Sequence, residues 1–326
     1  MVSKFISSTN IRSMSFINKI VDKVYVINLE KDKERLEYIT TQLKAQDIEF
    51  ERFEAVDGSK IKDDIRLTSQ CNTTCPDGLK GCAISHRTLW ETMIEKDYKN
   101  VLILEDDAIL NSNLNSELQL SWNEVPNDFD ILYLGSTFYC GDTSSYNKIV
   151  TKLTNRTIEN ISENILKTEG CGGLYGYIIS QNGAKNLMKE PIGFHVDDFI
   201  IGQVQKYSLN AYAFHPVLIE ANNKKSNLSQ YYPPFLSSIL SNIHITDQKN
   251  NQSLNWLLKE SFLQVGTIPI CSLMLIVFAL CFFIPLKYYF LAYIWLLLEL
   301  FISKDIKNTV VYFFIIIIPY IIKLSL

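Results

Sequence analysis

The feature that most constrains this chain is the uneven distribution of its apolar residues. From about residue 265 onward the sequence is almost wholly aliphatic and aromatic, whereas the part before it has the composition of an ordinary globular protein. Three apolar runs occupy this tail, at roughly 265–286, 288–302 and 309–322. A helix needs about 20 apolar residues to cross a bilayer, so the first run is long enough by itself and the other two are short. The sequence therefore predicts a membrane anchor of one to three transmembrane helices at 263–326.

The charged residues that flank these runs give a weak indication of orientation. If all three runs span the membrane, the flanking lysines divide into one set beside the globular part and another on the far side: Lys259, Lys304 and Lys307 against Lys287 and Lys323. Positive charge is enriched on the cytoplasmic side, so this division weakly favours a cytoplasmic globular domain. The N-terminal stretch lacks the uninterrupted apolar region of a signal peptide, which favours the same side.

Before the tail, short apolar segments alternate with segments of helical periodicity. Residues 23–29 have the short, β-branched, apolar character of a buried strand, and Leu36, Ile39 and Leu43 then recur at the spacing of one helix face. The alternation continues, with strands expected at 48–58, 100–107, 129–135, 172–180 and 209–220, and helices at 31–46, 82–96 and 181–190. This order is typical of an α/β domain with a mostly parallel sheet.

The chain divides into four parts on this basis. Residues 1–20 are rich in Ser and Asn and are expected to be flexible. The α/β domain follows at 21–235 and ends at the prolines of the sequence YYPPF. A polar linker at 236–262 then leads to the anchor.

Charge and cysteine content exclude some classes of protein. The formal net charge of −4 provides no basic field for a nucleic-acid backbone, so no nucleic-acid partner is expected. The seven cysteines are scattered without a C-x-x-C spacing, which argues against a zinc ribbon or a regular disulfide framework. Cys71 and Cys75 could close a small disulfide loop in an oxidising compartment. Glycosylation sequons stand at Asn72, Asn155, Asn160, Asn227 and Asn251, but such tripeptides arise often by chance in an Asn-rich chain.

The stretch NVLILEDDAIL, residues 100–110, brings three acids to the end of a segment that is built to be buried. Ligands of parallel α/β sheets bind beyond the carboxyl ends of the strands, where Glu105, Asp106 and Asp107 are expected. Crowded carboxylates raise one another's pKa unless a cation lies among them, and Mg²⁺ or Mn²⁺ is the simplest such cation. The alternative is a solvated acidic turn.

The geometry of the three acids stays open at the level of sequence. If the strand persists through them, alternation puts Asp106 on the opposite face of the sheet from Glu105 and Asp107. A turn at this point would instead bring two of the acids together.

Several segments in order resemble glycosyltransferase family 25. These segments are VYVINLEKDKERLEYI, FEAVDG and GCAISHRTLWETMIEKDYKNVLILEDDA, followed by LYGYIISQNGAKNLMKE and HVDDFI, and they cover roughly 23–219. The family includes bacterial lipooligosaccharide galactosyltransferases and animal procollagen galactosyltransferases. The resemblance implies a GT-A-like fold, a UDP-sugar donor (usually UDP-galactose or UDP-glucose), a metal ion and inversion at the anomeric carbon.

The resemblance also implies roles for the acids. Glu105, Asp106 and Asp107 stand in for the Asp-x-Asp motif, with Asp107 the first choice for the metal, Asp106 beside it, and Glu105 a second ligand or a ribose contact. An inverting transfer needs a general base opposite the leaving group. Asp197 is the first choice for this base and Asp198 the second. The alternative for this pair is a favourable interaction with a helix N-terminus.

Further residues are candidates for donor binding. Asn28 and Arg35 follow the first strand, where GT-A enzymes hold the nucleotide, although Arg35 could equally be a charge on a helix surface. Asp57 with its following glycine suits a turn that borders the uracil or ribose, and a plain turn explains it nearly as well.

Ser85 and two histidines complete the set of candidates. Ser85 and His86 lie near the start of the helix that precedes the acids, and His86 could bond to the donor or fill a structural role. His215 is a candidate late metal ligand, because GT-A sites often take one ligand from their C-terminal part.

The sequence thus predicts a membrane-anchored, metal-dependent, inverting glycosyltransferase. It would move galactose or glucose from a UDP-sugar to a hydroxyl of a glycan, glycoprotein or glycolipid. One alternative is a metal-dependent nucleotide phosphohydrolase, and another is an inactive membrane scaffold that retains a transferase-like domain.

Overall fold

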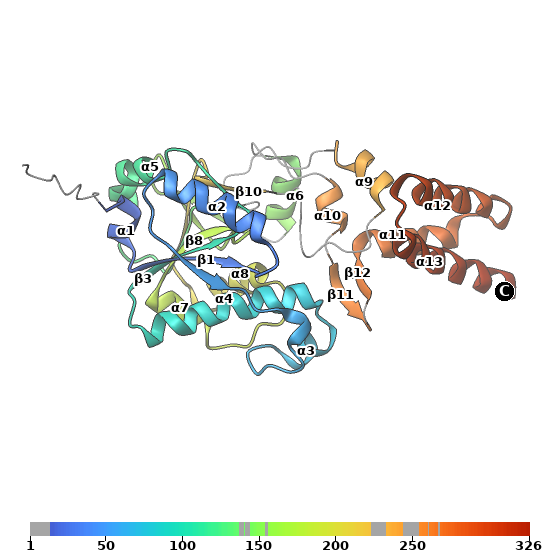
Figure 1. Ribbon diagram of the computed structural model, residues 1–326, viewed down its shortest axis with the longest axis horizontal. Helices are drawn as coiled ribbons and strands as arrows, with labels where there is room; N and C mark the ends of the chain where they lie inside the picture. Colours follow the sequence, from blue (N-terminus) through green and yellow to red (C-terminus); the bar gives the residue numbers. More distant parts are fainter. Residues whose placement is uncertain are drawn as a thin grey trace, which may run out of the picture.

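The computed structural model of the protein describes residues 14–136, 140, 144–153, 156–222, 233–243, 254–259, 261–266 and 268–326. Its central feature is an eight-stranded sheet with helices on both faces, followed by a bundle of apolar helices at the C-terminus (Figure 1). The order of the strands across the sheet is β2-β1-β3-β8-β5-β9-β7-β6.

Six of the eight strands run in one direction, and β7 and β8 run in the other. The strands are β1 (Lys23–Asn28), β2 (Glu51–Glu54), β3 (Asn100–Glu105), β5 (Ile131–Tyr133), β6 (Ile158–Asn160), β7 (Ile165–Thr168), β8 (Gly176–Ser180) and β9 (Ala211–Phe214). The predicted α/β class with a mostly parallel sheet is therefore confirmed. The insertion of an antiparallel strand, β8, between β3 and β5 was not predicted from the sequence.

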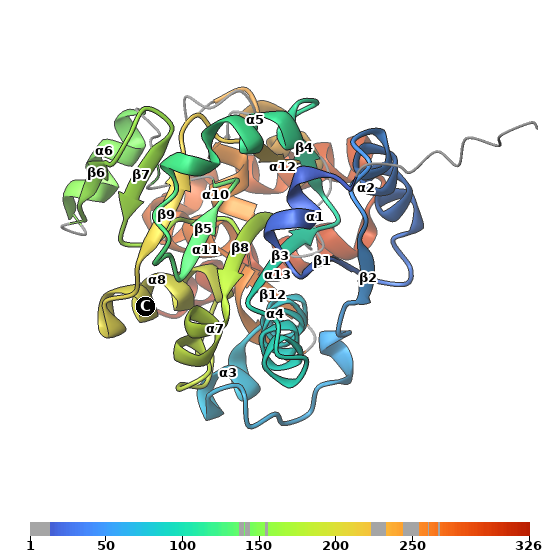
Figure 2. The same ribbon diagram turned by 90° about the vertical axis from the view of Figure 1, so that its left-hand side faces the viewer.

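Two apolar layers sandwich the sheet, and helices lie over both of its faces (Figures 1 and 2). Helices α1 (Phe16–Ile20), α2 (Lys33–Ala45) and α5 (Leu114–Ser121) cover one face, and α4 (Asp77–Glu95), α7 (Gln181–Leu187) and α8 (Val196–Tyr207) cover the other. Strand β3 shows the alternation directly, since Val101 and Ile103 pack towards α4 while Leu102 and Leu104 pack towards α2. Each of these fully buried side chains contributes about 1.5 to 3 kcal/mol.

The segment 1–20, predicted to be flexible, contains helix α1 in its described part. Residues 1–13 lie outside the described part of the chain, but Phe16–Ile20 is helical, and Ile17 is fully buried. The side chain of Ser15 caps the helix, and the backbone N–H of Ile17 donates to Asn115 Oδ1 of α5 at 2.9 Å. This contact could not be predicted from the sequence, because its partner lies 98 positions away.

The turn after β2 packs directly against α4. A Cβ atom on Gly58, the first residue of the 3-10 helix η1 (Gly58–Lys60), would lie 1.7 Å from the carbonyl oxygen of Asp77. A Cβ atom on Gly81, which faces this turn from α4, would lie 2.5 Å from the carbonyl oxygen of Val56. Both positions therefore need glycine for the close approach of two backbones.

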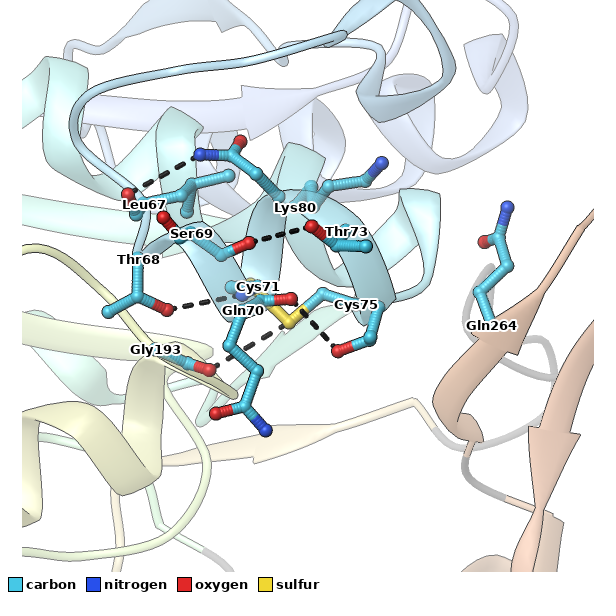
Figure 3. Close-up of a disulfide and its surroundings, with 12 residues drawn as sticks. Leu67, Thr68, Ser69, Gln70, Cys71, Thr73, Cys75, Lys80, Gly193 and Gln264 are labelled. Atoms are coloured by element: carbon cyan, nitrogen blue, oxygen red, sulfur yellow. Dashed lines mark hydrogen bonds between the residues drawn. A yellow bond between two sulfur atoms is a disulfide. The ribbon is translucent and has the colours of Figure 1, made fainter.

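Two disulfides lie in this part of the chain. Cys71 and Cys75 pair at the end of α3 (Ser69–Thr74), and Cys140 pairs with Cys171, at Cα–Cα separations of 4.6 Å and 5.7 Å. Figure 3 shows the first disulfide, with Gln264 of a later hairpin facing the same region. The Oε1 atom of Gln264 accepts the backbone N–H of Asp77 at 3.0 Å, which joins the C-terminal region to the start of α4.

The C-terminal region contains more structure than the predicted linker and anchor. It comprises α9 (Pro234–Leu240), α10 (Leu254–Lys259), the hairpin of β11 (Ser261–Val265) and β12 (Ile268–Cys271), α11 (Ser272–Phe283), η3 (Leu286–Tyr288), α12 (Tyr289–Ser303) and α13 (Ile306–Ser325). The segment 236–262 is therefore not a plain linker, since two helices and the start of a strand lie in it.

The lengths of the apolar helices reverse the expectation from sequence. The first run, predicted to be long enough to span a bilayer, is divided between β12 and the 12-residue helix α11. The helices long and apolar enough to span are instead 286–303 and 306–325, with 18 and 20 residues. Pro269 lies in the strand and Pro285 follows α11, so neither end of the first run can extend as helix.

Two polar contacts tie the C-terminal helices together. The ammonium group of Lys323 near the end of α13 donates to the carbonyl oxygens of Phe282 and Ile284, which satisfies the C-terminal end of α11. Glu299 in the middle of α12 is 3% exposed, and its two carboxylate oxygens accept the backbone N–H groups of Phe235 and Leu236 at 3.0 Å each. The start of α9 is therefore bound to the apolar bundle.

Candidate active site

The carboxyl ends of β1, β3, β5 and β9 meet at one edge of the sheet. Asn28 ends β1 and Glu105 ends β3, so two residues that the sequence singled out lie on adjacent strands at this edge. This is the edge at which open α/β sheets bind ligands.

A turn follows Glu105 and brings the next two acids towards one cation. Strand β3 stops at Glu105, and Asp106 and Asp107 form the turn before the short strand β4 (Ala108–Leu110). Arg35 of α2 lies with its Nη1 atom 2.9 Å from Asp106 Oδ1 and 3.9 Å from Asp107 Oδ2. Of the two geometries that the sequence allowed, the structure has the turn.

Asp106 is engaged by the protein itself. Its Oδ2 atom accepts the side-chain amide N–H of Asn28 at 2.7 Å, and its Oδ1 atom accepts the guanidinium N–H of Arg35 at 2.9 Å. Burial raises the pKa of Asp106, and the contacts with Asn28 and Arg35 oppose that effect. The cation that compensates Asp106 is therefore Arg35.

Asp107 is left with less compensation. Its Oδ1 atom is buried and accepts no hydrogen bond from any residue that the structure describes. Burial, and then the negative charge of Glu105, raise the pKa of Asp107 to about 8. A half-buried carboxylate with one buried, unpaired oxygen, beside a second carboxylate, fits a hard divalent cation such as Mg²⁺ or Mn²⁺, which prefers oxygen ligands.

Asn28 and Arg52 form the support behind Asp106. Asn28 is 2% exposed, and its amide nitrogen also donates to the carbonyl oxygen of Asp32 at 3.0 Å. Its amide oxygen accepts the guanidinium N–H of Arg52 in β2 at 2.9 Å. Asn28 was predicted to bind the donor, and in the structure its side chain bonds to Asp106 and Arg52. Arg52 was missed in the sequence because no motif marks it.

His86 lies inside the protein, behind Glu105, and is not exposed at the edge of the sheet. Its side chain is fully buried, with Nε2 3.3 Å from Glu105 Oε1 and Nδ1 2.9 Å from the Tyr177 hydroxyl. Trp90 Nε1 donates to the same hydroxyl at 3.0 Å, and burial raises the pKa of Tyr177 well above 10, so this hydroxyl stays protonated. The hydroxyl can then donate to Nδ1, which leaves the Nε2 hydrogen pointing at Glu105. His86 is therefore placed to orient Glu105.

Ser85 and Asp57 have local structural partners. The Ser85 hydroxyl is fully buried, donates to the carbonyl oxygen of Gly81 at 2.7 Å and accepts the N–H of Val56 at 2.8 Å. Asp57 is exposed and caps η1 by accepting the N–H and the hydroxyl of Ser59, which lowers its pKa. The plain-turn alternative for Asp57 agrees with this geometry.

His215 is not brought to the acids. It is exposed and directly follows β9, whose end lies three strand spacings from the end of β3, roughly 14 Å at about 4.8 Å per strand. The segment that returns to the acids is β10 (Ile219–Ala221), which pairs with β4, and the N–H of Asn222 donates to the carbonyl oxygen of Asp107 at 2.8 Å. The late segment that approaches the acids therefore does so through the backbone of Asn222 and not through His215.

Asp197 and Asp198 occupy the first turn of α8 and differ in their surroundings. The two carboxylate oxygens of Asp197 accept the backbone N–H groups of Gly173 at 3.1 Å and Asp198 at 2.9 Å. Asp198 remains accessible as a residue, but its carboxyl group is partly desolvated. Desolvation, and then the charge of Asp197, raise the pKa of Asp198 to about 6.

The two acidic groups are connected by a short piece of backbone. Gly173 binds Asp197, and two residues later the carbonyl oxygen of Tyr175 accepts the N–H of Glu105 at 3.2 Å. Two residues span at most about 7 Å, so the Asp197 pair and the Glu105–Asp107 turn border the same edge of the sheet.

A hollow of about 560 Å³ lies at the opposite edge of the sheet and is lined by Asp128, Asp130, Asn182 and Asn210 among others. Several of its polar side chains bond to one another, as Asn182 does to Asp130 at 2.7 Å and Asn210 to Asp128 at 3.0 Å. Because it surrounds the amino ends of the same-direction strands, it is not the site expected for this sheet.

An α/β sheet with acids on a turn at its carboxyl edge fits a broad class of enzymes that bind ligands at this edge, and it does not specify one reaction. The sequence comparison narrows that class. Residues 21–200, more than half of the 326 residues, match the model of glycosyltransferase family 25 (LPS biosynthesis protein), and the chain belongs to this family.

Individual relatives have low sequence identity to this chain. The chain is 30% identical over 173 residues to the lipooligosaccharide biosynthesis protein lic2B of Haemophilus influenzae, covering 50% of this chain and 61% of that protein. It is 23% identical over 232 residues to human procollagen galactosyltransferase 2, covering 61% of this chain and 34% of that protein. The chain therefore spans less than two thirds of each relative.

Among solved structures, a glycosyltransferase involved in the glycosylation of the major capsid of PBCV-1 aligns with 63% of this chain and 94% of its own. The TM-score is 0.33 and the sequence identity 10%, so this likeness carries no argument about function.

Proposed function

We propose that the protein is a metal-dependent, inverting glycosyltransferase that uses a UDP-hexose as donor. The observation that carries the proposal is Asp107, whose carboxylate has one buried, unpaired oxygen and a pKa raised to about 8 at the ligand-binding edge of a family 25 domain. The ionised form of Asp107 is unfavourable here without a nearby positive charge, and a divalent cation with a bound diphosphate would supply that charge.

Asp107 and Glu105 would hold the cation, and Asp106 would not. Both Asp106 oxygens already accept hydrogen bonds from Asn28 and Arg35, so its role is to fix Arg35 beside Asp107. Mg²⁺ or Mn²⁺, when bound, supplies positive charge for the departing diphosphate of the donor. The guanidinium group of Arg35 adds a second positive charge at the same point.

Asp198 is the better candidate for the general base. Its pKa, raised to about 6, lies near the pH at which an enzyme would remove a proton from an acceptor hydroxyl. Asp197 uses both oxygens on backbone N–H groups and would hold the start of α8 in position. We therefore exchange the order of preference that the sequence suggested for these two residues.

Galactose or glucose is proposed as the sugar because the family resemblance points to hexose donors. The acceptor would be a hydroxyl group of a glycan, glycoprotein or glycolipid. The names of the two relatives include lipooligosaccharide biosynthesis and procollagen galactosylation, which agrees with acceptors of this kind.

The test is a donor screen with the purified full-length chain, in which release of UDP from UDP-galactose and UDP-glucose is measured with candidate acceptors. EDTA should abolish turnover and Mn²⁺ should restore it in the wild type but not in Asp107→Asn. The exposed acid Asp63 provides the matched control, since Asp63→Asn should behave as the wild type. Full activity after metal removal would contradict the metal-dependent mechanism.

The same screen separates the alternatives. A nucleotide phosphohydrolase would release phosphate from a nucleotide without any acceptor. An inactive scaffold would show no turnover with any donor, and Asp198→Asn would change nothing that can be assayed.

We also propose that helices 286–303 and 306–325 anchor the enzyme in a membrane and that its α/β domain faces an oxidising compartment. Two cysteine pairs in this domain are disulfide-bonded, and disulfides persist on the oxidising side of a membrane. We give the disulfides more weight than the flanking lysines, which weakly favoured the cytoplasm. The numbers of lysines on the two sides differ by only one residue.

Labelling of thiols with a large maleimide after denaturation tests this orientation. Four of the seven cysteines are paired, so three should be labelled without a reductant and all seven after reduction. Asn160 is an exposed sequon in β6 and provides a second readout, since its glycosylation would require the same compartment. Labelling of seven cysteines without a reductant would assign the domain to the cytoplasm.

A further inference from the structure

Three side chains that commonly bind transition metals converge beside the proposed donor site. Cys82 and His86 lie one helical turn apart on the same face of α4, and Glu105 ends the neighbouring strand β3. The ligand atoms of these three residues all lie within 4.8 Å of one another. We propose that Cys82, His86 and Glu105 form a binding site for Zn²⁺ or a divalent ion of similar ligand preference.

The distances suit a small tetrahedral ion. Zinc bonds of about 2.0 to 2.3 Å separate neighbouring ligand atoms by roughly 3.3 to 3.7 Å. His86 Nε2 and Glu105 Oε1 are already 3.3 Å apart. The Cys82 sulfur therefore needs to approach by roughly 1.3 Å at most, which a side-chain rotation on a fixed helix can supply.

The surroundings of His86 are those of a metal-binding histidine. A ligating imidazole usually has its second ring nitrogen bonded to a fixed polar group, which sets the ring orientation. Here Nδ1 contacts the Tyr177 hydroxyl, and Trp90 donates to that hydroxyl in turn. On binding of the ion, the imidazole hydrogen would move from Nε2 to Nδ1, which would donate it to the Tyr177 oxygen, and the Nε2 lone pair would face the metal.

The chemistry of the three ligands separates this site from the one at Asp107. A thiolate and an imidazole favour zinc and its neighbours among the transition metals, whereas carboxylate oxygens favour Mg²⁺ and Mn²⁺. Cys82 is not in a disulfide and is partly exposed, and the Glu105 side chain is 27% exposed, so an ion can reach the site from solvent. The Cys82 thiol would release its proton to solvent as it binds.

Glu105 is shared between the two sites, which gives the zinc site a consequence for catalysis. This consequence rests on the proposed function, in which Glu105 helps to hold the catalytic cation. Zn²⁺ bound at Cys82 would withdraw Glu105 and should slow sugar transfer in the wild type more than in Cys82→Ser.

Binding is tested without any reference to activity. The full-length protein, freed of metal and kept without a reductant, is titrated with Co²⁺ as a spectroscopic substitute for Zn²⁺. The expected result is one Co²⁺ per chain with a thiolate-to-cobalt charge-transfer absorption, which Zn²⁺ displaces. Cys82→Ser should abolish this absorption and weaken Zn²⁺ binding at least tenfold, while Cys281→Ser, a change of another cysteine outside the disulfides, should retain both.

Two further variants keep the test decisive. Asp107→Asn should keep the cobalt absorption, and Glu105→Gln should keep it at reduced affinity. Cys82→Ala replaces Cys82→Ser if circular dichroism shows that the serine variant is misfolded. Survival of the absorption without Cys82, or its loss in Asp107→Asn, would overturn the proposal whatever the outcome of the donor screen.

Discussion

Replacement of Asp107 by Asn should stabilise the metal-free protein at alkaline pH while it abolishes catalysis. The folded-state pKa of Asp107 is raised from 3.8 to about 8. A raised carboxyl pKa contributes stability that is fully present below the unfolded pKa and is lost as the pH rises through the folded pKa. Between about pH 4 and pH 8, the metal-free wild type therefore loses stability that Asn, which has no proton to lose, retains.

The size of this stability difference follows from the raised pKa of Asp107. Each pKa unit is worth 1.36 kcal/mol, so three pH units between pH 5 and pH 8 correspond to about 4 kcal/mol. For a domain of about 200 residues, 1 kcal/mol changes the Tm by roughly 2 to 4 °C. Asp107→Asn should therefore melt roughly 8 to 16 °C above the wild type at pH 8 in EDTA, relative to their difference at pH 5.

The assay is thermal unfolding of the purified chain, followed by tryptophan fluorescence in EDTA at both pH values. Saturating Mn²⁺ should raise the Tm of the wild type at pH 8 and leave Asp107→Asn unchanged, because the ion stabilises the ionised carboxylate. Asp63→Asn, at an exposed acid, should follow the wild type throughout. The reasoning fails if Asp107→Asn and the wild type lose stability in parallel between pH 5 and pH 8, or if Mn²⁺ stabilises both equally.

Three further predictions concern other parts of the chain. Asp198→Asn should lower kcat by about 10²-fold or more with UDP binding retained. Wild-type turnover should rise with pH through about 6, since the base acts when it is ionised. An unchanged kcat would exclude Asp198 as the base. Gly58→Ala should destabilise the fold by about 1 to 3 kcal/mol or more because its Cβ meets the Asp77 carbonyl. Gly202→Ala should not destabilise it, because a Cβ atom there meets no other atom within 4 Å. The free energies of unfolding of the two variants are compared by chemical denaturation. Glu299→Ala should destabilise the C-terminal bundle by about 1 to 3 kcal/mol because two backbone N–H groups lose their acceptor, and equal protease sensitivity of this variant and the wild type would argue against that contact.

The candidate site could be predicted only in part. The apolar run followed by three acids was enough to predict a strand end at the ligand-binding edge, because strand formation and edge position depend on local pattern. The different states of Asp106 and Asp107 could not be predicted, since the partners of Asp106 lie 71 and 78 positions earlier in the chain. His86 illustrates the same limit, because its burial behind Glu105 depends on the packing of α4 against β3.

The apolar C-terminal helices show where counting apolar residues is insufficient. Hydropathy identified the tail correctly, but it ranked the run at 265–286 above the two that form the long helices. The hairpin of β11 and β12 takes the start of that run, and Pro285 ends α11, so length in sequence did not become length in helix.

The sequence by itself determined the α/β alternation, the apolar tail and the position of the acids, because each of these follows from local periodicity and composition. The tertiary structure decided which acid is neutralised by Arg35, which carboxylate is left with an unpaired oxygen, and which histidine reaches Glu105. These outcomes depend on burial and on contacts between residues far apart in the chain, and electrostatic energies change steeply with both.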